Sequence, residues 1–174
     1  LKLFKDDRKQ FWVNFTRRRL IALGISGPQS AELASQVSDY MGVNYKPQPY
    51  LPDGIHELLK NLQEKSYVLG VVSNRDEPFH TELEELGLKD YFRFALAGGE
   101  VQSFKPHPRI FERALELSGT AANETMYIGD NYFADVVGAL RSGLLPVLFD
   151  PSRLFPDAEC EVIRSYDEFY SLLA

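Results

Sequence analysis

Two aspartates, Asp130 and Asp135, stand where an apolar segment leads into an amphipathic one, in the stretch MYIGDNYFADVVGALRSG. Carboxylates at such a junction either cap the following helix or bind a hard cation such as Mg²⁺, which takes oxygen ligands and keeps several waters. For each aspartate alone, helix capping is the simpler explanation, because the N-terminal end of a helix favours negative charge. A metal site requires further polar groups at the same place.

Three more residues offer the groups that a phosphate needs. Ser73 and Asn74 end the apolar run YVLGVVSN, and Lys105 lies in the loop SFKPHP. The Ser73 hydroxyl, the Asn74 backbone N–H at the start of a helix and the Lys105 ammonium are the donors and the cation that surround a bound phosphate. Each alone is more simply a helix cap or a solvated lysine. Together with the two aspartates they suit phosphoryl transfer.

Alternating helices and strands must position these residues. Apolar runs predict strands over residues 67–74, 92–98, 125–130 and 145–150, with a short fifth over 160–163. Apolar residues at helical spacing predict helices over 53–65, 77–88, 108–119, 133–143 and 166–173. This alternation indicates an α/β fold with a doubly wound parallel sheet, in which ligands bind at the carboxyl ends of the strands. Ser73, Lys105 and Asp130 are therefore expected on one rim of the sheet.

The first 50 residues follow a different pattern. Apolar residues at three- and four-residue spacing predict two helices, one stopped by Gly24 and one closed by Gly42, with aromatic side chains packed between them. Three prolines between residues 47 and 52 then prevent a helix and stiffen the backbone, which is typical of a linker. We therefore expect a helical part with a Pro-rich linker over residues 1–50 and an α/β core over residues 51–174.

Composition narrows the classes of partner. The 174 residues include 25 acidic and 19 basic side chains, and the net charge of −6 argues against nucleic acid and anionic membranes as partners. The longest apolar runs are too short to cross a bilayer. Cys160 is the only cysteine, so we expect no intrachain disulfide and a cytoplasmic or other reducing intracellular location.

The segments VVSN, FKPHPRIF and GDNYFADVVGA, in this order, resemble the second, third and fourth motifs of the haloacid dehalogenase-like (HAD) hydrolases. Ser73 and Lys105 are 32 residues apart, and Lys105 and Asp130 are 25 residues apart, so order and spacing both resemble the superfamily's. The resemblance covers the whole chain. It implies a Rossmann-like parallel sheet, with residues 1–50 as part of the helical cap inserted after the family's first strand.

The resemblance also implies a mechanism. In the family, a nucleophilic aspartate attacks phosphorus to form an aspartyl-phosphate, a second aspartate two residues on acts as acid and then base, and Mg²⁺ bridges carboxylate and phosphate. Carried over to this sequence, Ser73 and Asn74 bind phosphate, and Lys105 offsets charge on the nucleophile and the phosphoryl group. Asp130 binds Mg²⁺, and Asp135 holds a metal-bound water or pairs with Lys105. The implied substrate is a small phosphorylated metabolite, a phosphomonoester.

Two features depart from the family's pattern. Its first motif, Asp-x-Asp at the end of the first strand, occurs nowhere in the 174 residues, and Ala134 stands where many members carry asparagine. In the family that strand lies mid-sheet, between the strands that end at Ser73 and Asp130, so its absence leaves backbone groups unpaired. We therefore expect a segment outside this sequence, on the same or a separate chain, to supply the strand and the nucleophile. The 174 residues alone are expected to be inactive.

Two other functions stay open. A catalytically inactive HAD-like domain that binds a partner or acts as a scaffold would explain the missing motif, but not the coexistence of the polar site residues. A metal-free haloacid dehalogenase is the second alternative, although the acidic pair Asp130 and Asp135 favours a magnesium phosphatase. His107, two residues from Lys105, is more simply a loop residue than a substrate contact.

Overall fold

The computed structural model of the protein describes residues 2–45 and 50–173. The chain divides into two compact units, Leu1–Tyr50 and Leu51–Ala174. Pro47 and Pro49 of the predicted linker lie outside the described residues. No helix within the described ranges is long and apolar enough to span a membrane.

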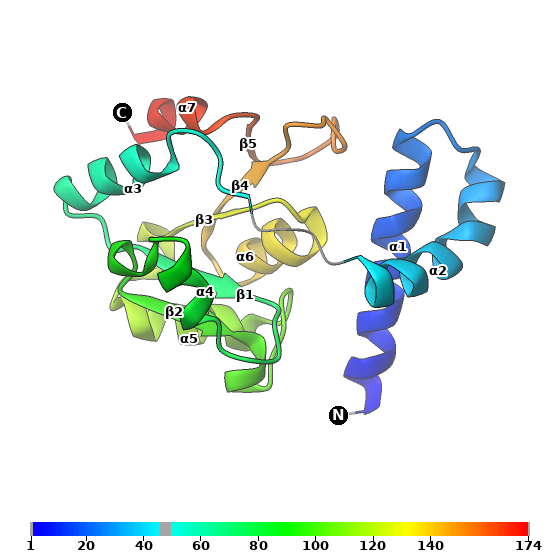
Figure 1. The fold of residues 1–174 in the computed structure, drawn as a ribbon, viewed down its shortest axis with the longest axis horizontal. Coiled ribbons are helices and arrows are strands. Elements are labelled where there is room, and N and C mark those ends of the chain that lie inside the picture. The colour runs from blue at the N-terminus through cyan, green and yellow to red at the C-terminus, as the bar shows by residue number, and fades with distance from the viewer. Residues whose placement is uncertain (1, 46–49, 174) are drawn as a thin grey trace. The chain divides into compact units, whose positions relative to one another are not determined.

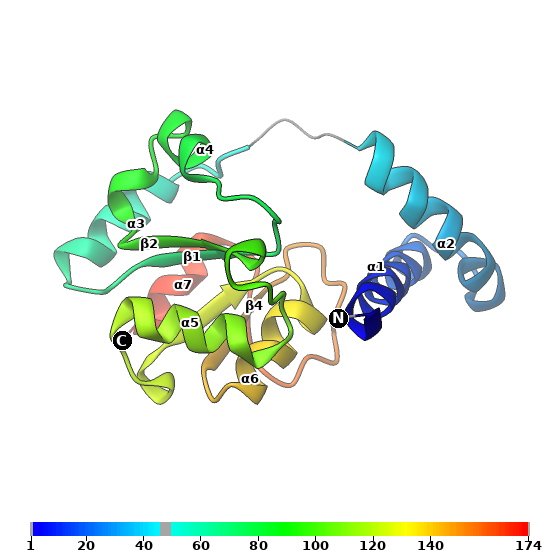
Figure 2. The same cartoon turned by 90° about the horizontal axis from the view of Figure 1, so that it is seen from below.

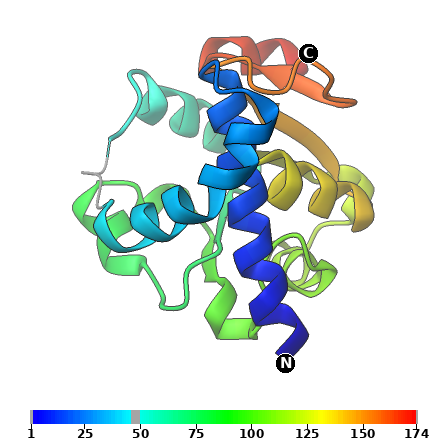
Figure 3. The same ribbon diagram turned by 90° about the vertical axis from the view of Figure 1, so that its right-hand side faces the viewer.

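The first unit is a pair of helices, α1 (Lys2–Ala22) and α2 (Gly27–Asn44), which pack against each other (Figures 1 and 3). α1 ends before Gly24, whose φ of 89° lies in the left-handed region that favours glycine. Pro28 fits the first turn of α2, where its missing N–H costs no hydrogen bond. The predicted end of α2 at Gly42 was wrong, because a helix passes through a glycine at modest cost.

Among the residues of this unit whose burial the structure describes, small residues of α2 are the buried ones. Ala34 is buried, as is Ser30, whose hydroxyl donates to the Gly27 carbonyl at 2.8 Å. Trp12 and Tyr40, in contrast, are 42% and 66% exposed. The prediction that aromatic side chains pack between the two helices was wrong for these two, because a pair of helices shares only one narrow line of contact.

The second unit alternates strands and helices. Its strands are β1 (Gly70–Ser73), β2 (Phe94–Ala97), β3 (Met126–Gly129), β4 (Leu145–Phe149) and β5 (Glu161–Ile163). Its α-helices are α3 (Ile55–Glu64), α4 (His80–Glu85), α5 (Pro108–Ser118), α6 (Val137–Arg141) and α7 (Tyr166–Phe169). Short 3₁₀ turns occur at Lys89–Tyr91, Gly98–Val101, Ala122–Glu124 and Tyr170–Leu173, and a π-helical turn occurs at Tyr132–Val136.

The strands form two parallel sheets, in the orders β2–β1 and β3–β4–β5. Val72 of β1 lies opposite Leu96, and Ile128 of β3 lies opposite Val147. Successive side chains point to opposite faces, as strand geometry requires: Val71 joins the cluster beneath α3 and α4, whereas Val72 packs against α5. The parallel pairing confirms the predicted α/β class with a Rossmann-like sheet.

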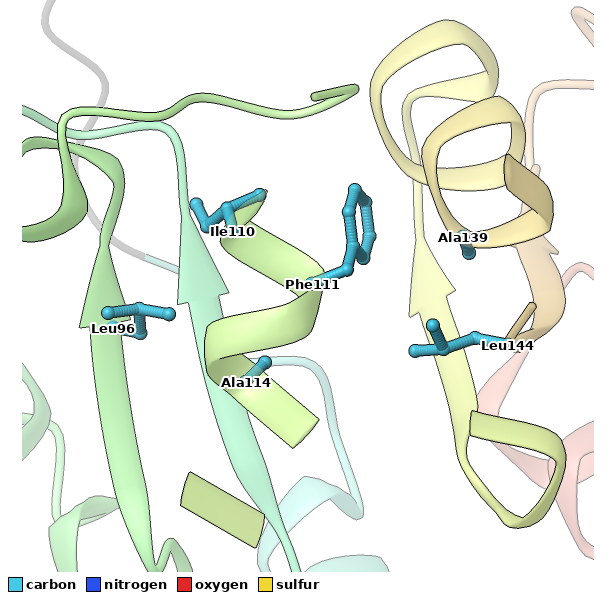
Figure 4. Close-up of a cluster of buried hydrophobic side chains, with 6 residues drawn as sticks. All are labelled: Leu96, Ile110, Phe111, Ala114, Ala139 and Leu144. Carbon is cyan, nitrogen blue, oxygen red and sulfur yellow. The ribbon is translucent and has the colours of Figure 1, made fainter. Parts of the chain in front are cut away.

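Helices cover both faces of the sheets (Figure 2). On one face, α5 and α6 enclose a core that contacts both sheets, through Val72 of β1 and Tyr127 of β3. Figure 4 shows its buried members, which are Leu96, Ile110, Phe111, Ala114, Ala139 and Leu144. On the other face, α3 packs with α4 over β2 and with α7 over β4 and β5. The two helical layers therefore hold the two sheets together.

Within the described residues, no strand pairs with the second edge of β1 or of β3. Backbone groups of successive strand residues point to alternate sides, and the carbonyls of Leu69 and Thr125 bond toward β2 and β4. Val72 lies three residues after Leu69, and Ile128 lies three residues after Thr125. Because an odd separation reverses the direction, the N–H and C=O groups of Val72 and Ile128 point to the unpaired edges. The arrangement agrees with the predicted absence of the central first strand from this sequence.

One predicted helix starts later than expected. Residues 74–79 form an irregular loop, and α4 begins only at His80. The cause is Pro78, because a residue that precedes proline avoids helical backbone angles and Glu77 therefore cannot begin the helix. The loop lies directly after β1, so it belongs to the rim on which the site is expected.

Candidate active site

The predicted site residues meet at the carboxyl ends of β1 and β3. Ser73 is the last residue of β1, Asp130 directly follows β3, and Lys105 lies in the loop before α5. The Lys105 Nζ atom lies 2.6 Å from Asp135 Oδ1 and 3.3 Å from the carbonyl oxygen of Val72. One ammonium thus contacts both the end of β1 and the turn after β3, the edge at which ligands bind in such sheets.

Asn74 holds the Lys105 loop through its side chain. Its Oδ1 atom accepts a hydrogen bond from the Lys105 backbone N–H at 2.7 Å, and its Nδ2 donates to the Lys105 carbonyl at 2.9 Å. The prediction that the Asn74 backbone N–H stands at a helix N-terminus was wrong, since α4 begins at His80. The sequence analysis did not predict these two hydrogen bonds of the Asn74 side chain. The only indication in the sequence is the residue type, because a side-chain amide that follows a buried strand can both donate and accept.

The Lys105–Asp135 ion pair is almost enclosed, with side chains 12% and 4% exposed. Burial disfavours the Lys105 cation, but the charges of Tyr127 and Asp135 and the hydrogen bond from Lys105 to Asp135 outweigh burial and raise the pKa of Lys105 above its ordinary value. Lys105 is therefore a cation at neutral pH. A buried ammonium of this kind is tolerated only because its partners replace the lost water.

Tyr127 is a site residue that sequence reasoning missed. It lies inside the apolar run of β3, and its ring centroid is 5.5 Å from Lys105 Nζ. Burial raises the pKa of the Tyr127 hydroxyl to about 12, although the Lys105 charge acts in the opposite direction. The signal in the sequence is a hydroxyl within an otherwise apolar strand, but the face to which it points is fixed only by the register of the sheet.

Both carboxylate oxygens of Asp135 have donors. Oδ1 accepts from Lys105 Nζ, and Oδ2 accepts from the Asn131 backbone N–H at 2.9 Å. Gly129 makes room for this arrangement, because a Cβ at that position would overlap the Asp135 carboxylate. Of the two roles predicted for Asp135, the pairing with Lys105 is therefore present in the structure.

A π-helical turn directs Asp135 toward Lys105. It spans Tyr132–Val136, where a regular α-helix was predicted. The Asn131 side chain caps this turn, because its Oδ1 atom accepts a hydrogen bond from the Ala134 backbone N–H at 3.1 Å. Because a π-turn holds an extra residue, it can bring the Asp135 carboxylate back onto the Asn131 N–H; such turns are frequent at functional sites.

Asp130 is exposed at the tip of β3. Within residues 2–45 and 50–173, its carboxylate accepts no hydrogen bond and forms no ion pair. The same residues contain no group of three or more His, Cys, Asp or Glu side chains that could hold a metal ion. An open carboxylate suits Mg²⁺, so Asp130 fits one ligand of a magnesium site, whereas the oxygens of Asp135 are already occupied.

Ser73 is half-buried at the end of β1. Its hydroxyl makes no hydrogen bond to any other part of the chain that the structure describes. A hydroxyl left open on this rim is the donor that an incoming anion requires.

His107 has a structural role, as the simpler of its two interpretations predicts. Its Nδ1 atom accepts a hydrogen bond from the Arg109 backbone N–H at 3.2 Å, which caps α5. The same nitrogen lies 3.3 Å from the Ser103 hydroxyl. The imidazole therefore helps to fix the loop that carries Lys105.

Solved structures share this fold. The protein aligns with a HAD phosphatase from Thermococcus onnurineus at a TM-score of 0.67 and 22% identity, over 95% of this chain and 92% of that chain. It aligns with the putative HAD-hydrolase YfnB from Bacillus subtilis bound to magnesium at a TM-score of 0.64 and 23% identity, over 97% and 82% of the two chains. Identities this low show the fold alone.

A curated relative, ribulose-1,5-bisphosphate 5-phosphatase of Halopiger xanaduensis, is 30% identical over 137 residues, which are 78% of this chain and 57% of that protein. The chain spans about half the length of the curated relatives it matches. The family model of the haloacid dehalogenase-like hydrolases matches residues 3–148. Because that match covers most of the sequence, the protein belongs to the haloacid dehalogenase-like hydrolase family.

Proposed function

We propose that the protein is the larger part of a magnesium-dependent phosphohydrolase that acts on a small phosphomonoester. The observation that carries the proposal is the Lys105 ammonium, held by Asp135 against the end of β1, with Ser73 at the carboxyl end of β1 and Asp130 directly after β3. A fixed cation, an open hydroxyl and an open carboxylate are the groups that bind a phosphate together with Mg²⁺.

Ser73, Asn74 and Lys105 bind the phosphate in this proposal. The Ser73 hydroxyl and the Asn74 backbone N–H donate to phosphate oxygens, and the Asn74 side chain keeps the Lys105 loop in place. The hydrogen bond from Lys105 to the Val72 carbonyl is long, at 3.3 Å, so a phosphate oxygen readily replaces that carbonyl as acceptor. The resulting contact between ammonium and phosphate is charge-assisted and therefore strong.

Asp130 is the proposed magnesium ligand. When bound, Mg²⁺ supplies polarisation of the phosphoryl oxygens and neutralises part of their charge. Asp135 contributes indirectly, because its two oxygens fix Lys105 and the start of the turn that follows β3.

The nucleophile is proposed to come from a segment outside the 174 residues, on the same or a separate chain. The unpaired edges of β1 and β3 favour this, since a further parallel strand would satisfy their backbone groups and end beside Lys105. An aspartate of that strand attacks phosphorus and forms an aspartyl-phosphate, while the ester oxygen that leaves phosphorus takes a proton from a second aspartate of the same strand and departs as the alcohol. Water then hydrolyses the acyl phosphate, which releases inorganic phosphate and restores the carboxylate, while Lys105 offsets negative charge in both steps.

Two relatives support a small phosphomonoester as the substrate class. One is the ribulose-1,5-bisphosphate 5-phosphatase described above. Another is a glyceraldehyde 3-phosphate phosphatase of Pyrococcus abyssi, 30% identical over 97 residues, which are 55% of this chain and 41% of that protein. Both are named for a phosphate ester of a small sugar.

NMR titration of the 174-residue chain with inorganic phosphate tests the anion site. The amide signals of Ser73, Asn74 and Lys105 should shift together, and Ser73→Ala should weaken the affinity about tenfold, because one hydrogen bond to a charged group is lost. Ser152→Ala, which changes an exposed loop serine, is the matched control and should leave the affinity unchanged. The site would be rejected if phosphate shifted other amide signals but not those of these three residues. It would also be rejected if Ser73→Ala bound phosphate with unchanged affinity.

The magnesium part is tested by the same titration with Mg²⁺. Signals around Asp130 should shift, and Asp130→Asn should abolish the shift because an amide is a much poorer ligand than a carboxylate. Asp90→Asn removes another exposed carboxylate, near the amino end of β2, and should have no effect. A response that survives Asp130→Asn would contradict the assignment of the metal ligand.

A further inference from the structure

Two glycines that directly follow β2, Gly98 and Gly99, contact both loops of the proposed phosphate site. A Cβ at Gly98 would overlap the ring of Phe104, the residue before Lys105. A Cβ at Gly99 would overlap the backbone of Asp76, in the loop after β1. The Gly99 contact is the more rigid of the two, because a ring can turn aside more easily than a backbone segment can move.

The loop after β1 is tied to Gly99 by a hydrogen bond as well as by this close approach. The Gly99 N–H donates to the Arg75 carbonyl at 3.0 Å, just beyond the ends of β1 and β2. Asp76 then crosses directly over the Gly99 Cα, so the loop leaves β1 on the side of β2. The Val72 carbonyl, which Lys105 Nζ contacts, points to the opposite edge of β1. The loop is therefore turned away from the ammonium.

Asn74 is held from two directions as a result. Its side chain forms hydrogen bonds of 2.7 and 2.9 Å with the Lys105 backbone, and its neighbour Arg75 is held by Gly99. Ser73, on its other side, is fixed by the pairing of β1 with β2. These anchors fix the short segment that supplies the proposed phosphate donors.

We propose that Gly99 is a positioning residue of the phosphate site. Its N–H and its lack of a side chain keep the Arg75–Asp76 backbone over β2, which leaves the Ser73 hydroxyl and the Asn74 N–H uncovered for a phosphate. The inference rests on the proposed function, in which these two groups bind phosphate together with Lys105.

The variant Gly99→Ala tests the role through inorganic phosphate. In the NMR titration of the 174-residue chain it should weaken the affinity about tenfold, because the displaced loop loses one hydrogen bond to a charged group. Gly70→Ala, at the amino end of β1, is the matched control, since a Cβ there would overlap the Phe94 ring. A methyl group enters occupied space in both variants, but only Gly99→Ala should change the affinity. Urea titration verifies that each variant is folded.

Amide exchange in the unchanged chain is a second test, which applies even where Gly99→Ala does not fold. The Gly99 N–H exchanges with water only when its bond to the Arg75 carbonyl opens. If that opening breaks the site, phosphate at about ten times its dissociation constant should slow the exchange about tenfold. The Gly119 N–H, bonded to the Leu115 carbonyl at the end of α5, is the control and should exchange at an unchanged rate.

Two results would overturn the inference alone. One is phosphate affinity in a folded Gly99→Ala protein that equals that of the unchanged chain. The other is exchange at Gly99 that phosphate does not slow, or slows no more than at Gly119. Failure of the unchanged chain to bind phosphate is a separate result, which refutes the proposed function and this inference with it.

Discussion

At the scale of single residues, the Lys105–Asp135 pair differs from the other ion pairs among the described residues. Its side chains are 12% and 4% exposed, whereas those of Arg113 and Glu116 are 45% and 65% exposed. Exposed pairs contribute little because water and salt screen them. A buried pair has given up its water, so the removal of either partner leaves an uncompensated charge.

Asp135→Asn should therefore lower the free energy of unfolding by about 3–5 kcal/mol, as for other broken buried pairs. Glu116→Gln, which breaks an exposed pair, should cost less than about 1 kcal/mol. Urea denaturation of both variants measures the difference. Equal stability of the two variants would show that the Lys105–Asp135 pair is screened like a surface pair.

Tyr127 makes the stability depend on alkaline pH. Its pKa is about 12 in the folded protein and 10.0 ordinarily, so the folded state holds this proton more tightly than the unfolded chain does. The associated stabilisation is complete below about pH 10 and disappears as the pH rises through about 12. Urea unfolding at about pH 9 and about pH 11 should show a smaller loss of stability in Tyr127→Phe than in the unchanged protein. A loss of the same size in both would contradict the raised pKa.

Whether the sequence alone could place a residue at this site depends on what positions that residue in the fold. Ser73, Lys105 and Asp130 could be predicted, because strand ends and strand order are readable from apolar runs and the carboxyl ends of parallel strands share an edge. The Asn74 side-chain contact and the place of Tyr127 beside Lys105 could not. Both depend on distances between segments that are far apart in the sequence, and on which face a strand residue occupies.

At the scale of elements, the turn after β3 decides the geometry of the site. The apolar spacing of residues 133–143 predicts a regular helix, but the structure has a π-helical turn at Tyr132–Val136 and then α6. The spacing of apolar residues is compatible with both, so the sequence alone could not distinguish them. What selects the wider turn is the capture of the Asp135 carboxylate by Asn131 N–H and Lys105.

Gly129→Ala tests this turn. A methyl group there would overlap the Asp135 carboxylate and push it from Lys105, so the variant should lose about 1–3 kcal/mol of stability, as overpacked sites do. Gly42→Ala, inside α2 with open space around it, should instead gain up to about 1 kcal/mol. Thermal or urea unfolding compares them, and a Gly129→Ala protein as stable as the unchanged one would refute the tight contact.

At the scale of the whole second unit, two parallel sheets are joined by helices instead of by strand pairing. α5 and α6 on one face and α3 on the other contact both sheets, while β1 and β3 each keep one unpaired edge. The α/β class and the parallel order were predictable from the alternation of strands and helices. The missing strand pairing between β1 and β3 was predictable too, because the sequence lacks the Asp-x-Asp motif that ends the strand expected between them.

We propose that this rim is a magnesium-dependent phosphate site whose nucleophile and acid–base aspartate come from a segment outside the 174 residues. The most direct test is release of phosphate from an aryl phosphate by the 174-residue chain and by a longer form that carries an Asp-x-Asp strand. We expect no release by the 174 residues, whereas release by the longer form should require Mg²⁺ and should stop with a chelator or with Asp130→Asn. Magnesium-dependent release by the 174 residues alone would show that no further segment is needed for catalysis. The proposal would equally be contradicted by inactivity of the longer form toward phosphate esters, or by its turnover of alkyl halides in the presence of a chelator.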